Sequence, residues 1–189
     1  MKKFELTSEF ITNIFGTKLF RIKALIEFGN VKAGELGGFV EKEENLNHEG
    51  NAWVYGNAEV YGNARVYGNA SVYGNASVYG NASVYGNARV CGDARVYGNA
   101  WVYGNARVCD DARVYGNADY ATVHGFGSEY RTTTFFKTKA GEIGVRCGCF
   151  YGNLSEFRKK VVETHGETKK AKEYLMLADL MEFRFSDNS

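Results

Sequence analysis

The stretch of sequence that decides the fold runs from residue 71 to residue 118 and reads SVYGNASVYGNASVYGNARVCGDARVYGNAWVYGNARVCDDARVYGNA. The same six-residue unit extends back to Gly50, and its valine recurs at every sixth position without exception. These valines are residues 54, 60, 66, 72, 78, 84, 90, 96, 102, 108 and 114. A fixed short period of this kind is the signature of a solenoid, in which each repeat packs only against its neighbours.

Each hexad carries the residues of one straight side and one corner. The residue before Val, the Val itself and the Tyr that follows favour a strand, and alternation along it turns Val to one side and both neighbours to the other. Gly and Asn tolerate positive φ and supply the corner, while the small Ala turns inward. Three such sides close one coil, and the three-hexad period is also visible where RVCGDARVYGNA (89–100) recurs as RVCDDARVYGNA (107–118).

We therefore predict a mainly β protein built on a left-handed parallel β-helix of hexapeptide repeats, with about 18 residues per coil. With ~4.8 Å between neighbouring coils, the block from Gly50 to Ala118 makes roughly four coils, filled by Val and Ala. Val40 and Leu46 keep the period in an earlier coil. The eight-residue step from Leu46 to Val54 then predicts an outward loop around residues 47–49, which carries His48.

The two ends of the β-helix need covers, because an open coil exposes unpaired N–H and C=O groups. We expect residues 1–36 to form an N-terminal β cap, residues 37–120 the β-helix and residues 121–189 a C-terminal module. In the cap, alternation places Phe20, Ile22, Ala24 and Ile26 on one face of a half-buried strand.

The C-terminal module is predicted to have the order ββαα. Residues 131–137 and 143–150 form a hairpin around residues 139–141. Asn153 caps the first helix, with Glu156 three residues on, and Gly166 ends it. The second helix places an apolar stripe on one face, formed by Ala171, Tyr174, Leu175, Ala178 and Met181.

The composition excludes several classes of function. Because 23 Lys and Arg residues offset 22 Asp and Glu residues, the net charge of +1 gives no general attraction to nucleic acid or to an anionic membrane. The opening residues lack an apolar signal-peptide core, and no stretch approaches the ~20 apolar residues that span a bilayer. Four cysteines do not form the dense framework of a secreted scaffold. We expect a cytoplasmic protein that binds no membrane.

The chain resembles a known family along most of its length. The segment VKAGELGGFVEKEENLNHEGNAWVYGNA (31–58), the array that follows it, the segment FFKTKAGEIGVRCGCFYGNLSEF (135–157) and the ETHG of residues 163–166 are similar to hexapeptide-repeat proteins of bacteria and their phages, of the YdcK-like sort. The resemblance implies the left-handed β-helix and suggests a homotrimer. It implies no established activity.

A group of arginines in the last coils is the candidate ligand site. Acidic residues 93, 110 and 111 lie nearby in sequence, so one interpretation is a solvated ladder of ion pairs. The alternative is an anion-binding patch, in which paired guanidiniums grip a phosphorylated or nucleotide-like ligand beside tyrosine rings. The residues of this patch are Arg89, Arg95, Arg107, Arg113, Tyr97 and Tyr115.

Tyrosine and cysteine each occupy outward columns of the array. Tyrosines three hexads apart should stack along the prism, and so much aromatic surface also suggests burial against other subunits. Cys91 and Cys109 replace Tyr in one column, and we expect tolerated small residues there, because neighbours on parallel strands are rarely placed for a disulfide. Cys147 and Cys149 should share one face of a strand as small core residues, and with only C-x-C visible we predict no metal site.

The leading functional hypothesis is a non-enzymatic binding or scaffold protein of phage or prophage type. One concrete form is interference with host defence, by sequestering a nucleotide-like ligand or blocking a host protein. The alternative is an enzyme resembling the hexapeptide acyltransferases, which use a histidine as general base. His48 is the only histidine near a coil. We therefore assign no catalytic residue and no cofactor.

Overall fold

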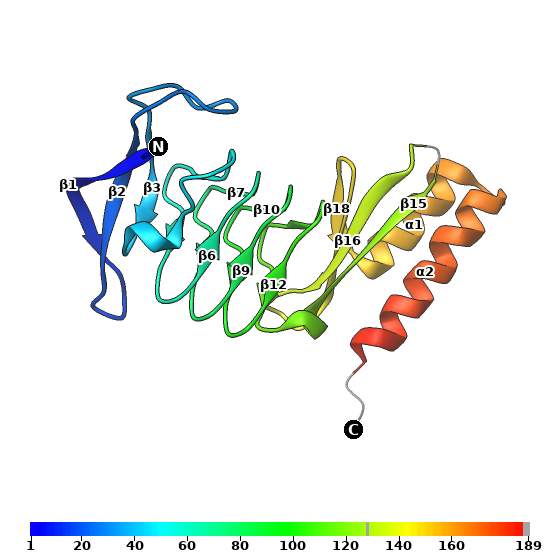
Figure 1. Ribbon diagram of the computed structural model, residues 1–189. Coiled ribbons are helices and arrows are strands. Elements are labelled where there is room, and N and C mark those ends of the chain that lie inside the picture. Colours follow the sequence, from blue (N-terminus) through cyan, green and yellow to red (C-terminus); the bar gives the residue numbers. More distant parts are fainter. Residues whose placement is uncertain (128, 187–189) are drawn as a thin grey trace.

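The computed structural model describes residues 1–127 and 129–186 and shows a parallel β-solenoid of about four turns, with about 18 residues per turn. The coils stack in one direction between a strand-rich N-terminal end and a C-terminal module that carries two helices (Figure 1). The short strands of the coils are β4 (Trp53–Val54), β5 (Glu59–Val60), β6 (Arg65–Val66), β7 (Ser71–Val72), β8 (Ser77–Val78), β9 (Ser83–Val84), β10 (Arg89–Val90), β11 (Arg95–Val96), β12 (Trp101–Val102), β13 (Arg107–Val108) and β14 (Arg113–Val114).

Successive hexads occupy successive faces of the prism. The first face holds β5, β8, β11 and β14, the second holds β4, β7, β10 and β13, and the third holds β6, β9 and β12. Strands within a face pair in parallel with partners three hexads apart, such as Val78 with Val96. Every Val and Ala of the repeat from Ala52 to Val114 is fully buried, so the predicted core is confirmed.

The corners from Gly50 to Asp110 each hold one residue with positive φ, whereas Gly116 of the last hexad is extended. Gly86 has φ +69°, and a β-carbon there would lie 3.0 Å from the backbone nitrogen of Gly104 in the next coil. Both the positive φ and the tight stacking of corners therefore favour glycine. Asp110 stands at a glycine position of the repeat and takes φ 60°, a conformation that Asp reaches more easily than most residues.

The frame slip predicted before Val54 is present. Val40 pairs with Val60 and Leu46 with Val66, so the step between these partners exceeds three hexads, whereas all later strand partners lie three hexads apart. The 3-10 helix η1 (Glu43–Asn45) lies just before the slip. His48 lies in the slip and stacks on Phe4, with 4.3 Å between ring centroids, so the N-terminal strand covers this loop.

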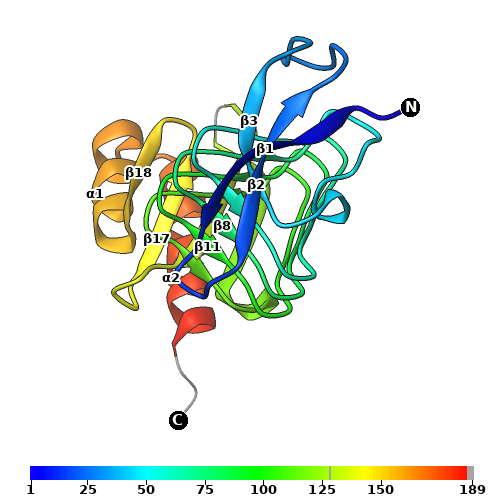
Figure 2. The same ribbon diagram turned by 90° about the vertical axis from the view of Figure 1, so that its left-hand side faces the viewer.

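The N-terminal end continues the sheet of the first face. β1 (Phe4–Thr12) pairs antiparallel with β2 (Lys18–Ala24), β2 pairs antiparallel with β3 (Leu36–Val40), and β3 pairs in parallel with β5. These strands lie across the end of the stacked coils (Figure 2). Trp53 occupies an outward column of the repeat but is fully buried, because Phe4 and Phe28 pack edge-on against its ring.

Side chains pair the carbonyl groups that the first coil leaves open. On the second face the Nζ of Lys3 donates to the carbonyls of Gly50 (3.3 Å) and Ala52 (2.9 Å). On the third face the Nδ2 of Asn45 donates to the carbonyls of Gly62 (3.1 Å) and Ala64 (2.8 Å). These two residues have the same places in the repeat as Gly50 and Ala52, two hexads later. The covering of the first coil thus depends on polar side chains as well as on strands.

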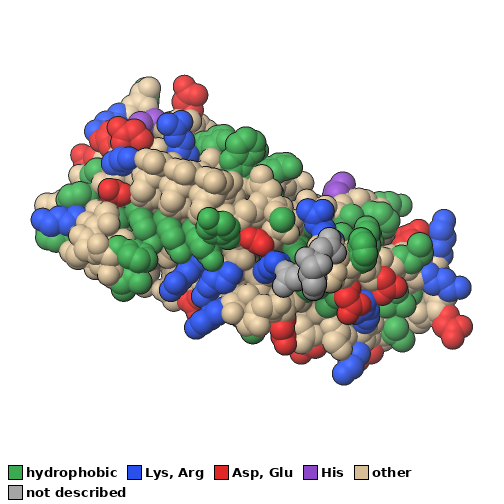
Figure 3. Space-filling model, turned by 90° about the horizontal axis from the view of Figure 1, so that it is seen from below, with side chains coloured by type: hydrophobic (Ala, Val, Ile, Leu, Met, Phe, Trp, Pro, Cys, Tyr) green, Lys and Arg blue, Asp and Glu red, His purple; other side chains and the backbone are tan. Residues whose placement is uncertain are grey.

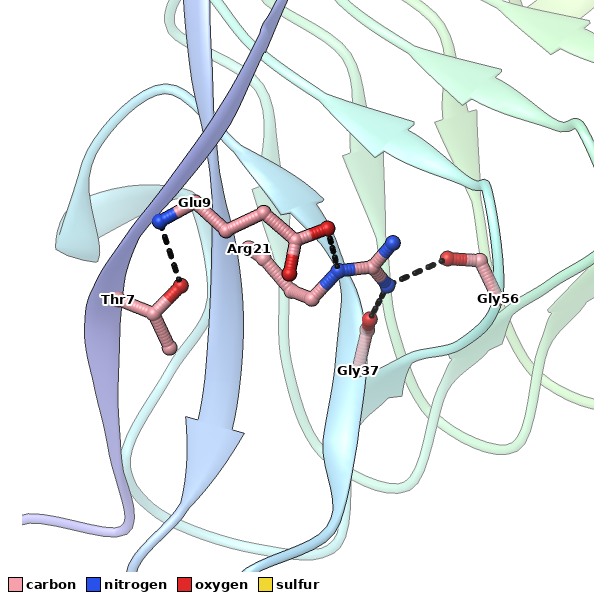
Figure 4. Close-up of polar contacts among 5 residues, drawn as sticks. All are labelled: Thr7, Glu9, Arg21, Gly37 and Gly56. Atoms are coloured by element: carbon pink, nitrogen blue, oxygen red, sulfur yellow. Dashed lines mark hydrogen bonds and ion pairs between the residues drawn. The ribbon is translucent and has the colours of Figure 1, made fainter.

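Arg21 ties the cap to a corner of the solenoid. Its Nε lies 2.7 Å from a carboxylate oxygen of Glu9, and its Nη1 donates to the carbonyls of Gly37 (2.8 Å) and Gly56 (3.5 Å) (Figure 4). The backbone N–H of Glu9 in turn donates to the hydroxyl of Thr7. One guanidinium therefore connects β1, β3 and the first corner.

The last coil is closed by groups from the C-terminal part of the chain. The backbone N–H of Trp101 donates to Asn117 Oδ1 (2.8 Å), in the 3-10 helix η2 (Asn117–Asp119). The backbone N–H of Arg107 donates to Thr134 Oγ1 (3.0 Å). Both N–H groups face the side on which a further coil would have supplied carbonyls.

The C-terminal module is a four-stranded antiparallel sheet with two helices and its own core. Its elements are β15 (Tyr120–Phe126), β16 (Arg131–Lys137), β17 (Ile143–Cys147), β18 (Phe150–Asn153), α1 (Leu154–His165) and α2 (Lys169–Phe185). The Asn153–Glu156 capping box and the end of α1 at Gly166 are confirmed. The predicted strand 143–150 is instead two strands, because Gly148 (φ 60°) turns the chain between β17 and β18.

That turn separates the two cysteines expected to share one face. Cys147 is half-buried and its Sγ accepts a hydrogen bond from Thr133 Oγ1 (3.2 Å), whereas Cys149 lies in the turn and is exposed. The expectation of two core cysteines was therefore wrong for Cys149. A glycine between two cysteines marks a turn as readily as a strand, and the sequence offered no means of choosing.

The other cysteine pair also departs from expectation. Cys91 and Cys109, stacked on adjacent coils of the second face, form a disulfide with their Cα atoms 4.4 Å apart. A persistent disulfide is typical of oxidising compartments, so the expectation of a cytoplasmic location loses the support that it drew from cysteine usage. Among the described helices, none is long and apolar enough to cross a membrane.

The buried Lys3 predicts a specific pH dependence of stability. Burial lowers the pKa of Lys3 from its ordinary value of 10.5 to about 8. Between these two values the unfolded chain holds a proton that the folded chain has released, so stability rises with pH across this window. We expect urea unfolding to show that rise in the wild type and to show less of it in Lys3→Met. An identical pH profile in both proteins would contradict the assignment, and Lys23→Met on the exposed side of β2 is the control.

The disulfide predicts a stability change on reduction. Closing the loop between Cys91 and Cys109 should stabilise the fold by about 3 kcal/mol, so a reductant should lower the Tm of the wild type but not of the Cys91→Ser/Cys109→Ser double variant. When the protein is unfolded in denaturant without a reductant, alkylation should label Cys147 and Cys149 alone. Labelling of all four cysteines would rule the bond out.

Candidate anion-binding site

The structure divides the six residues of the predicted patch between two faces. Arg95, Arg113, Tyr97 and Tyr115 lie on or directly after the strands of the first face, while Arg89 and Arg107 lie on the second face. The six residues predicted as one patch therefore lie on two neighbouring faces of the prism. Residues that are close in sequence need not lie on one face. Each hexad turns the chain onto the next face, and only residues three hexads apart stack.

On the first face, Arg113 binds the backbone of its own protein. Its Nη1 donates to the carbonyls of Asp93 (3.0 Å), Asp111 (3.1 Å) and Ala112 (2.8 Å). The alternative interpretation, a ladder of ion pairs, is not seen either. Within residues 1–127 and 129–186 no salt bridge joins the four arginines to Asp93, Asp110 or Asp111. The Nη1 of Arg113 thus stabilises a corner of the solenoid.

On the second face, Arg89 and Arg107 lie in a pocket of about 260 Å³ at the junction with the C-terminal module. They stack on adjacent coils, paired residue to residue across β10 and β13. Arg131 and Thr132 of β16 line the opposite side. The complete lining is Asn87, Arg89, Asn105, Arg107, Arg131, Thr132 and Gly148.

The turn between β17 and β18 brings two of the guanidiniums together. Arg107 Nη1 lies 3.4 Å from the carbonyl oxygen of Gly148. A β-carbon at Gly148 would lie 2.7 Å from Arg131 Nη1, so the absence of a side chain there lets Arg131 approach the same point. Two positive groups thus converge beside one glycine.

The charge of the pocket is not balanced from within. None of the described residues that line it is acidic. Arg131 has one carboxylate neighbour, Glu129 Oε2 at 3.7 Å, and both side chains are more than half exposed, so this pair contributes little. Three guanidiniums facing a small, carboxylate-free pocket create a positive potential that favours an anion.

An asparagine ladder adds a neutral donor to the pocket. Asn51, Asn69, Asn87 and Asn105 occupy one corner column, and each Nδ2 donates to the Oδ1 of the next residue at 3.2 Å. Asn105 is the last rung, because the position three hexads later, Val123, belongs to β15. The amide dipoles of this ladder point the same way, and its terminal NH₂ group lies at the pocket.

Two of the three arginines in this pocket, Arg89 and Arg107, were predicted from the sequence. The three-hexad period places Arg89 over Arg107. Arg131, Thr132 and Gly148 belong to the C-terminal module, which does not repeat, so its position on the last coil cannot be predicted by counting residues. The expected tyrosine partners are not present, since none of the described lining residues is aromatic.

His48 is poorly placed to act as a general base. Its Nδ1 accepts a hydrogen bond from the backbone N–H of Lys3 (3.1 Å), which leaves the proton on Nε2, and Nε2 lies 3.6 Å from a carboxylate oxygen of Glu43. Both ring nitrogens therefore face protein groups, while the ring stacks on Phe4. The geometry does not favour the acyltransferase hypothesis.

Among the remaining histidines and cysteines, Cys147, Cys149 and His165 line one pocket together with Tyr174. His124 Nδ1 lies 3.3 Å from Thr132 Oγ1, and the ring of His165 stacks against that of Tyr174, 5.8 Å between centroids. Over the described part of the chain, no three His, Cys, Asp or Glu side chains are grouped as metal ligands.

The predicted tyrosine stacking is confirmed on two faces. On the first face Tyr61 and Tyr79 stack with ring centroids 4.9 Å apart, and on the third face Tyr67 and Tyr85 stack at 4.8 Å. Figure 3 shows a long face of the molecule on which hydrophobic side chains, a class that includes tyrosine, gather along the solenoid beside Lys and Arg side chains. The rings cover one another and leave most of these tyrosines half-buried within a single chain.

The stacked hexads, with inward Val and Ala and glycine corners, define the class of hexapeptide-repeat solenoid proteins. Within that class, a family model described as the YdcK beta solenoid repeat matches residues 58–74, 88–104 and 106–118. These matches support a YdcK-like repeat within residues 58–118. No curated protein matches it.

Proposed function

We propose that this chain is a non-enzymatic binding protein whose solenoid supports a site for a phosphorylated ligand. The observation that carries the proposal is the convergence of Arg89, Arg107 and Arg131 on a pocket without an acidic lining residue. Guanidinium groups match phosphate oxygens in planar, two-pronged hydrogen bonds, which makes arginine the preferred residue for this purpose.

The energetics of the pocket favour an anion of multiple charge. Three like charges held near one another repel, and a bound phosphate relieves this repulsion while it accepts hydrogen bonds. The terminal amide of Asn105 and the hydroxyl of Thr132 add neutral donors at the rim. Because Arg89 and Arg131 are exposed, the attraction should weaken as ionic strength rises.

The scaffold is suited to holding such a site without movement. Arg89 and Arg107 each stand two residues before a cysteine of the disulfide, so the coils that carry them are joined covalently. The N–H of Arg107 is bound to Thr134 of the module that supplies Arg131. A preformed site binds its ligand with little loss of conformational freedom.

The biological form of the proposal is sequestration of a phosphorylated host ligand by a protein of phage or prophage type, and this form comes from family resemblance. The same resemblance carries the proposal of a homotrimer, for which a mass in solution of three times 21.0 kDa is the expected result.

Calorimetric titration with inorganic pyrophosphate tests the site. We expect saturable binding with a dissociation constant that rises with salt. Arg107→Gln and Arg89→Gln should each weaken binding at least about tenfold, because each removes a charge-assisted contact. Arg95→Gln is the matched control, since it has the same place in its hexad but lies on the first face. Equal loss in Arg95→Gln and Arg107→Gln would show unspecific attraction and would contradict the proposed site.

A further inference from the structure

The tyrosine ladder of the third face ends in an uncovered ring. Tyr67, Tyr85 and Tyr103 stack with centroids 4.8 Å and 5.4 Å apart and with interplanar angles of 3° and 15°. Tyr103 is 51% exposed. The position three hexads later is Ala121, which has left the solenoid for β15, so the chain supplies no further ring to this ladder.

The ladder of the first face ends differently. Its last ring, Tyr115, is turned 64° from the plane of Tyr97, an edge-to-face contact that interrupts the parallel stack. Tyr103, by contrast, stays nearly parallel to Tyr85 and presents a flat face at nearly the same spacing as the rungs beneath it.

A groove lies beside this last rung. It has a volume of about 650 Å³ and runs between the third face and α2. Trp101, 53% exposed, stands next to Tyr103 in it, and Met181 and Arg184 of α2 form the opposite wall. Tyr120 is buried at its base, where its hydroxyl donates to the carbonyl of Trp101 (2.7 Å).

We propose that this groove binds a planar heteroaromatic ring, the base of a nucleotide, as the next rung of the Tyr67–Tyr85–Tyr103 ladder. A nucleobase stacks on a tyrosine face at the distance that the rings of the ladder already keep. Trp101 borders the ring, and the Arg184 guanidinium can stack on an aromatic face or pair with a polar edge.

The position of the groove relative to the arginine pocket favours a nucleotide over other aromatic ligands. Tyr103 lines the groove and Asn105 lines the pocket, and the two residues flank Gly104 at the corner between the third and second faces. Two residues of chain place the Cα atoms of Tyr103 and Asn105 within about 7 Å of each other, so the groove and the pocket open on the two sides of one corner. This link to a phosphate rests on the proposed function, whereas the stacking site does not.

Fluorescence and calorimetric titrations of the full chain with adenosine, adenosine monophosphate and pyrophosphate test the inference. The chain has two tryptophans, of which Trp53 is fully buried, so quenching reports on Trp101. We expect adenosine to quench the emission, and Trp101→Phe to remove that signal while calorimetry still detects adenosine. Adenosine monophosphate should bind at least about tenfold more tightly than adenosine, and Arg107→Gln should abolish this difference.

Matched variants identify the ring that carries the stack. Tyr103→Ala should weaken adenosine binding at least about fivefold, Tyr103→Phe should keep it, and Tyr115→Ala, at the end of the other ladder, should change it by less than about twofold. Absence of any response to adenosine, or equal losses in Tyr103→Ala and Tyr115→Ala, would overturn the stacking site. Equal affinity for adenosine and its monophosphate would overturn the link between groove and pocket.

The two proposals fail in different ways. If pyrophosphate binds and adenosine does not, the groove is not a base site and the proposed function stands. If adenosine binds and pyrophosphate does not, the arginine pocket fails and the stacking site stands. A groove that instead accepts an aromatic side chain from a second copy would show concentration-dependent mass and no response to adenosine, an outcome that also overturns the inference.

Discussion

Pairing of the main-chain groups at the two open edges is the constraint on which the rest of this structure depends. Within the solenoid the N–H groups of each coil donate to carbonyl groups of the next coil, as the Trp53 N–H donates to the carbonyl of Ala70. The first and last coils lack that neighbour, and an unpaired buried N–H or C=O costs about as much as a lost hydrogen bond. Each added coil leaves a new open edge, so residues outside the repeat must pair the main-chain groups at the two ends of the solenoid.

The two ends meet this requirement by different means. At the first coil, β3 adds a strand on one face, while Lys3 and Asn45 supply single donors on the other two. At the last coil, acceptors come from Asn117 and Thr134, and a bridge joins Ala112 to Thr138. Docking of the C-terminal module therefore closes the edge, and the same contact places Arg131 opposite Arg107. The candidate site is a consequence of how the last coil is closed.

Features that depend only on the spacing of the repeat could be predicted from the sequence, whereas features that depend on tertiary contacts could not. The valine period alone determines the core, the three faces and the stacking of Arg89 over Arg107, because each depends only on counting residues. Trp53 lay in an outward column and is buried by Phe4 and Phe28, about which the period says nothing. The Cys91–Cys109 bond depends on how closely two outward side chains approach in the folded coil.

The same limit applies to the site and its surroundings. Arg131 and Gly148 belong to a module that does not repeat, and their place over the second face is fixed by a tertiary contact. The missing rung after Tyr103 was visible in principle, because position 121 is Ala. Its meaning required knowing that α2 lies beside the gap and forms a groove.

The most direct measurement of the central claim is amide hydrogen exchange at Arg107 in the wild type and in Thr134→Val, which keeps the shape of the side chain but removes the acceptor. If closure of the last coil holds the module and the site together, the Arg107 amide is protected in the wild type. It should then exchange at least about tenfold faster in the variant, while the amide of Ser83 in the coil below stays protected. Unchanged protection of Arg107 in Thr134→Val would contradict the account.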